Sequence, residues 1–130
     1  MLIRVCDYGP EREVGTGAEV EAILAERAAN GMNSWWVSWD SMYPCVGILA
    51  NGDLACVHYF PDDRHAGFVA KGPAPGLDPS GQTMFSISGL SNEEDWTPNT
   101  DVVDFSVAIQ VVRDFVRDRA MSSSVVWLEL

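Results

Sequence analysis

The sequence has very little positive charge. It carries 8 Lys and Arg residues, only one of them lysine, against 19 Asp and Glu residues, which gives a net charge of −11. Proteins that bind nucleic acids directly draw most of their affinity from basic side chains on phosphates, so this class is disfavoured. The arginines near the C-terminus, Arg113 and Arg117, alternate with Asp114 and Asp118, which cancels much of their field. An acidic surface instead attracts a basic partner, typically a protein that itself acts on nucleic acid.

The sequence also lacks signals that would direct it to a membrane or out of the cell. It has no apolar run long enough to span a bilayer, and residues 1–9 include Arg4 and Asp7 where a signal peptide needs an apolar stretch. Its three cysteines are an odd number without the spacing of a disulfide framework. We therefore expect a cytoplasmic protein with reduced thiols and no membrane partner.

Motifs that hold metals, phosphates or catalytic nucleophiles are missing as well. There are two histidines, and neither a CxxC pair nor an HExxH motif occurs. Cys56 and His58 share one face of a predicted strand, which leaves a small enzyme or ligand-binding domain using that face as an alternative. The main expectation is a protein that is not an enzyme and has no metal or cofactor.

The first 30 residues predict a helix. Thr16 and Glu19 have the spacing of a capping box, apolar residues follow at helical spacing, and Asn30-Gly31 is a typical stop. This predicts a helix over 17–30 with a solvated polar face. The members of that face are Glu19, Glu21, Glu26 and Arg27.

A run of strands is predicted next. Residues 35–39 alternate so that Trp35 and Trp39 point to one side, into the core, and Trp36 to the other. Residues 45–50 and 54–60 flank Asn51-Gly52-Asp53, the strongest short hairpin signal. Weaker patterns predict strands over 67–71 and 82–88, with a loop over 72–81 and an acidic loop over 89–100.

The last third predicts a second helix and a closing strand. An unbroken apolar stripe at i, i+3, i+4 and i+7 predicts a helix over 105–119 that belongs to the core, with Asp104 as its cap. Residues 125–128 predict a final strand. The sequence therefore predicts one α+β domain over 1–130, with two helices on a mostly antiparallel sheet of about five to six strands. The stripe consists of Phe105, Ala108, Ile109, Val112, Phe115 and Val116.

From Tyr43 onward several motifs follow one another in a distinctive order and spacing. Tyr43-Pro44 precedes the strand-turn-strand unit CVGILANGDLACVHYF, and a loop with Gly and Pro leads to a strand containing Phe85. Val102-Val103 then enters the second helix, which ends near RDFV, and the chain closes on Val126-Trp127-Leu128-Glu129-Leu130. In this order and spacing the chain resembles the first immunity-protein family of bacterial polymorphic toxin systems. The MSSS segment departs from the Gly or Pro turn that this family usually has there.

The resemblance implies a protein that binds and inhibits a toxin made by the same cell, with a nucleic-acid deaminase as the expected toxin. The family has no catalytic motif to transfer, so the contact residues follow from chemistry: acids that meet a basic cleft and aromatics that anchor. A secretion chaperone or adaptor is the remaining alternative. The predicted contacts are Trp96, Glu93, Glu94, Asp95, Asp62, Asp63, Trp36, Asp40 and Tyr43.

Overall fold

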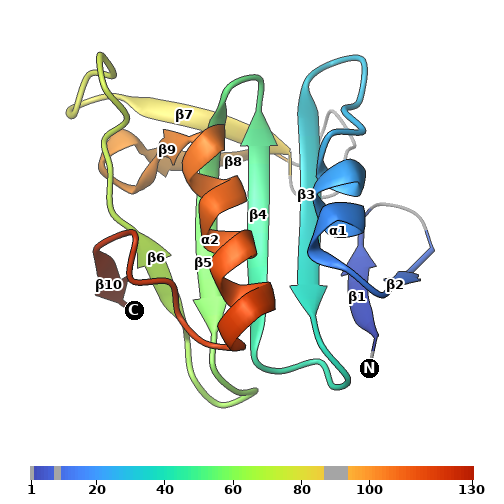
Figure 1. Ribbon diagram of the computed structural model, residues 1–130. Coiled ribbons are helices and arrows are strands. Elements are labelled where there is room, and N and C mark those ends of the chain that lie inside the picture. The colour runs from blue at the N-terminus through green and yellow to red at the C-terminus, as the bar shows by residue number, and fades with distance from the viewer. Residues whose placement is uncertain (1, 8–9, 87–93) are drawn as a thin grey trace.

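The computed structural model describes residues 2–7, 10–86 and 94–130 (Figure 1). Its main sheet is built on three seven-residue strands, β3 (Met32–Ser38), β4 (Cys45–Asn51) and β5 (Leu54–Phe60). The short strands β1 (Ile3–Cys6) and β2 (Arg12–Val14) extend one edge. The other edge is extended by β6 (Phe68–Ala70) and β10 (Trp127–Glu129).

The main sheet has eight strands in the order β10-β6-β5-β4-β3-β1-β2, and β9 (Val103–Asp104) pairs with β5. Every pairing is antiparallel. The predicted α+β class with a mostly antiparallel sheet is confirmed. The number of strands exceeds the predicted five to six, because β1, β2 and β9 have only two to four residues and show too little alternation to be found.

The predicted Asn51-Gly52 hairpin joins β4 to β5. Asn51 pairs with Leu54, so the loop consists of two residues, Gly52 and Asp53. Gly52 has φ +59°, a left-handed conformation that glycine adopts without the steric penalty of a Cβ. This tight turn fixes the register of the two central strands.

Both helices lie on one face of this sheet (Figure 1). The long helix α2 (Phe105–Asp118) buries the predicted apolar stripe over the centre of the sheet, with Phe115 fully buried against Tyr59 and Val57 in the same core. Asp104 is the N-cap residue, but its side chain makes no capping hydrogen bond; the Phe105 N–H donates to the Asp53 carbonyl instead. The prediction that this stripe is core is confirmed.

The first helix, α1 (Gly17–Leu24), begins where predicted, with the Glu19 N–H donating to the Thr16 hydroxyl at 3.2 Å. It ends at Leu24, so the predicted extension to residue 30 is wrong. The cause is Arg27, whose guanidinium donates to the Gly31 and Gly52 carbonyls and lies 4.6 Å from the Phe105 ring. These contacts hold residues 25–31 as a loop, and Arg27 is half-buried rather than solvated.

A second, two-stranded sheet packs on the opposite face. It consists of β7 (Gln82–Ser86) and β8 (Glu94–Pro98), followed by the 3-10 helix η1 (Asn99–Asp101). The Phe85 side chain packs with Cys56 and Val69, which point away from the helices. The predicted acidic loop over 89–100 is therefore wrong for residues 94–98. Their strand depends on pairing with β7, which local sequence does not encode.

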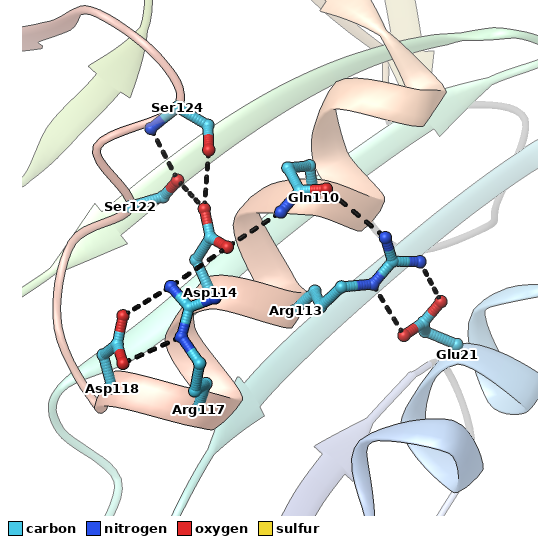
Figure 2. Close-up of polar contacts among 8 residues, drawn as sticks. All are labelled: Glu21, Gln110, Arg113, Asp114, Arg117, Asp118, Ser122 and Ser124. Atoms are coloured by element: carbon cyan, nitrogen blue, oxygen red, sulfur yellow. Dashed lines mark hydrogen bonds and ion pairs between the residues drawn. The ribbon is translucent and has the colours of Figure 1, made fainter.

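The C-terminal segment is fastened to α2 through one buried carboxylate (Figure 2). Asp114 accepts hydrogen bonds from the Ser122 and Ser124 hydroxyls at 2.5 and 2.7 Å and from Gln110 at 2.8 Å. The Trp127 indole N–H then donates to the Ser122 carbonyl at 2.8 Å. Asp114 thus orders the connection that places β10 beside β6.

Candidate partner-binding face

The sheet face opposite the helices is covered at one end by β7 and β8, and Trp36 is exposed on the same face. Strand register places Cys6, Trp36, Gly47 and His58 in one row across β1, β3, β4 and β5. Trp36 is 47% exposed, whereas its neighbour Trp35 is 1% exposed under the helices. The predicted alternation of these two tryptophans is therefore confirmed, and it leaves a large aromatic side chain on the open face.

Three rings gather on this face. The Trp36 and Phe60 centroids lie 5.3 Å apart with planes at 29°, and Phe60 and His58 stack at 5.6 Å and 10°. Gly47 lies between them on β4; because it has no side chain, the Trp36 and Phe60 rings meet across that strand. Stacked rings at such separations form a stable apolar surface.

Two hollows adjoin the rings and share Trp36 as a wall. The first, called here the aromatic hollow, has a volume of about 220 Å³, and the residues that line it include Ser34, Trp36, Gly47, Leu49, His58, Phe60 and Asp95. The second, the apolar hollow, has a volume of about 360 Å³, and its walls include Arg4, Cys6, Trp36, Met42, Tyr43 and Cys45. Neighbouring concave sites with aromatic walls are typical of binding surfaces.

The electrostatics of the aromatic hollow are negative. Burial lowers the pKa of His58, and the opposing effects of Asp101 and Asp95 are smaller, so His58 is neutral at pH 7. Asp95 is the only carboxylic acid among the described residues that line this hollow, and no Lys or Arg is among them. The surface therefore combines ring faces with one carboxylate.

The alternative function that uses Cys56 and His58 is disfavoured by the chemistry of the Cys56 thiol. The Cys56 sulfur lies 3.9 Å from His58 Nδ1, but burial raises the pKa of the thiol to about 12. A cysteine nucleophile reacts as its thiolate, which is scarce at such a pKa. Burial likewise raises the pKa of Cys45 to about 11. Cys56 packs with Phe85 and Val69 in the cluster beneath β7, and His58 stacks on Phe60 in the aromatic hollow.

The predicted contact residues fall into two groups at opposite ends of the sheet. Asp40 and Tyr43 follow β3, and Asp62 and Asp63 follow β5; because Ser38, Cys45 and Phe60 are aligned by register, these segments lie at the same end. Tyr43 lines the apolar hollow, and the three acids at this end are exposed or nearly so. The Asp62 carboxylate accepts from the Arg64 N–H, which ties the loop after β5 into a turn.

The second group belongs to β8. Trp96 is 56% exposed, and its indole N–H donates to the Glu94 carboxylate at 3.2 Å, so this ring does not fill a loop interior. Asp95, between them, points the other way and lines the aromatic hollow. Glu93 lies outside the described residues. Only Asp95 of this group is thus brought together with Trp36.

Sequence reasoning missed Phe60, Gly47 and Met42 as parts of this face. The alternation of 54–60 places Phe60 and His58 on one side, so a signal for Phe60 was present. Gly47 and Met42 gain their importance only from the strands or loops beside them, and nothing in the local sequence marks them.

Among the described residues, no group of three or more His, Cys, Asp and Glu side chains is arranged to hold a metal ion. In the same part of the chain, neither helix is long and apolar enough to cross a membrane. The sequence matches no protein-family model, and no curated protein matches it. Assignment of a function therefore depends on the chemistry of the open face.

Proposed function

We propose that this chain is an immunity protein that binds and inhibits a cognate toxin in the cytoplasm, the toxin being a nucleic-acid deaminase. The observation that carries the proposal is the exposed aromatic face with Asp95 beside it, a carboxylate that forms no ion pair among the described residues. Trp36, Phe60 and Tyr43 offer rigid anchors, and aromatic side chains of this kind dominate the energetics of protein interfaces.

The distribution of ion pairs supports a basic partner. Arg12, Lys71, Arg113 and Arg117 are engaged by acids of the same chain. With 19 acids against 8 cations, many carboxylates are left for an external cation. A protein that acts on nucleic acid has a positive substrate cleft, and an acidic inhibitor associates with such a cleft quickly and blocks it.

The test is co-expression with the product of the adjacent gene, followed by co-purification and by rescue of growth. The purified partner is then assayed for deamination of cytidine in a single-stranded oligonucleotide, with and without an equimolar amount of this protein. An unrelated protein of the same net charge is the control. Stoichiometric inhibition by this chain alone supports the proposal.

Co-purification without inhibition of any activity would favour the adaptor or chaperone alternative. Failure of the adjacent gene product to bind, together with turnover of a small molecule by this protein alone, would favour the enzyme alternative. Either result would overturn the proposal.

A further inference from the structure

The aromatic hollow has the chemistry of a site for a single organic cation. The Trp36, Phe60 and His58 rings lie on one side, and Asp95 lies at the rim contributed by β8. The negative faces of aromatic rings attract cations, most strongly for Trp, and a nearby carboxylate adds a direct charge. Because His58 is neutral at pH 7, it does not repel a cation in the hollow.

Asp95 is available for an incoming group. Among the described residues it forms no ion pair, and its hydrogen bond comes from the Thr97 hydroxyl, at 3.4 Å from Oδ2. Other acids of the chain differ in this respect: Asp101 is 3.0 Å from the Lys71 ammonium, and Glu21 is held by two nitrogens of Arg113. The carboxylate at the hollow therefore lacks an internal counter-charge.

On the other face of the sheet, tryptophan rings are in contact with arginine side chains of the same chain. There Arg27 lies over the Trp35 and Phe105 rings, at 5.9 and 4.6 Å, and Arg119 lies 4.1 Å from the Trp39 ring. In the described part of the chain no guanidinium lies over Trp36. The two tryptophans packed on the helix side are thus covered by arginines of the chain itself, and Trp36 is left uncovered.

We propose that the aromatic hollow receives an arginine side chain from the basic surface of the toxin, with the guanidinium on the Trp36 ring and paired with Asp95. The inference rests on the proposed function for the identity of the partner. Arginine fits better than lysine because a planar guanidinium stacks on rings and bonds a carboxylate through two nitrogens at once. The hollow then fixes the orientation of the complex.

A probe experiment tests the hollow without any toxin. The purified protein, labelled with ¹⁵N, is titrated with N-acetyl-argininamide, and the indole N–H resonance of Trp36 is followed. N-acetyl-citrullinamide, which has the same shape without the charge, is the matched ligand. Trp96 is the matched residue, since it is as exposed as Trp36 but does not line the hollow.

The expected result is a saturable shift of Trp36, and not of Trp96, with the arginine probe alone. Asp95→Asn, which keeps the size of the side chain, should weaken probe binding to the Trp36 indole about three- to tenfold with an unchanged melting temperature. Trp36→Leu removes the reporter indole, so binding to that variant is followed through the backbone amide of Gly47, and it should weaken by a similar factor. Equal shifts with the citrulline probe, or equal shifts of Trp96, would overturn the inference.

A second experiment uses the toxin recovered by co-expression. Each surface arginine of the toxin is changed to alanine and combined with Trp36→Leu in a double-mutant cycle. One arginine should show strong coupling to Trp36, and purely additive effects for all of them would overturn the inference. If the probe binds and the toxin does not, the proposed immunity function is wrong, and the aromatic hollow is still a site for an arginine side chain. If the toxin binds and the probe does not, the immunity function is supported and the arginine site is wrong.

Discussion

The hydrogen bonds around Asp114 allow a sharp prediction about stability. Asp114 is 5% exposed and Ser122 is 3% exposed, so replacing the carboxylate with the methyl of alanine removes three accepted hydrogen bonds at a buried site. Hydrogen bonds to a charged group contribute about 1.5–3 kcal/mol each, but part of this sum offsets the cost of burying the carboxylate, which the variant no longer bears, and water can reach the Ser124 side. We expect Asp114→Ala to lower the free energy of unfolding by about 2–4 kcal/mol.

The effect should depend on pH in a defined direction. Hydrogen bonds from Ser122 and Ser124, more than any other contact, lower the pKa of Asp114 below its ordinary value of 3.8. A group with a lowered folded-state pKa is protonated first in the unfolded chain, so its contribution is complete above the unfolded pKa and is lost as pH falls through the folded one. The difference between wild type and variant should be constant from about pH 7 to 5 and shrink below about pH 4.

Chemical denaturation at each pH measures this difference, and the Trp127 indole reports on it locally. Its N–H donates to the Ser122 carbonyl, so its hydrogen exchange should accelerate in the variant by more than the global loss of stability explains. Asp118→Ala is the control on the same helix, because Asp118 is exposed and its ion pair is with the likewise exposed Arg117, at 2.7 Å. Equal stability of Asp114→Ala and Asp118→Ala at pH 7 would refute the reasoning.

Three further predictions concern the core, the thiols and the partner. Phe115→Ala should cost about 3–5 kcal/mol in denaturation experiments, since Phe115 is fully buried; an unchanged melting temperature with lost toxin binding would mean that α2 is interface. Cys45 and Cys56 should react with a disulfide reagent at pH 8 far more slowly than the unfolded chain, since burial raises their pKa to about 11 and about 12; rapid labelling of either thiol contradicts that. Association with the toxin should slow between roughly 50 and 500 mM salt, and a salt-independent rate in stopped-flow measurements argues against steering by charge.

The sequence predicted those elements that local chemistry determines. The Asn51-Gly52 turn, the α2 stripe and the opposite orientations of Trp35 and Trp36 all follow from periodicity or turn preference within a few residues. The end of α1 was missed because it depends on Arg27, which bonds to Gly52 25 positions away. Strand β8 was missed because its partner β7 supplies the pairing.

The candidate face was predictable only in part, for the same reason. Trp36, Tyr43 and Asp95 were found as side chains suited to an interface, but their grouping around two hollows depends on the register of β3, β4 and β5. Asp62 and Asp63 lie at one end and Trp96 at the other, a separation that composition does not reveal. Charge and residue type thus identify candidate contact residues, and the register of the strands determines which of them lie side by side.

Strand alternation along β3 and β5 also separates positions where a substitution changes the core from positions where it changes the outer face. Along β3, Trp35 and Val37 pack beneath the helices while Trp36, between them, faces outward; along β5, Val57 and Tyr59 alternate with His58 and Phe60 in the same way. A substitution at 36 or 60 alters the shape of the outer face and leaves the volume under α2 as it was. The outer face can therefore change by single substitutions while the core that holds the fold together stays intact.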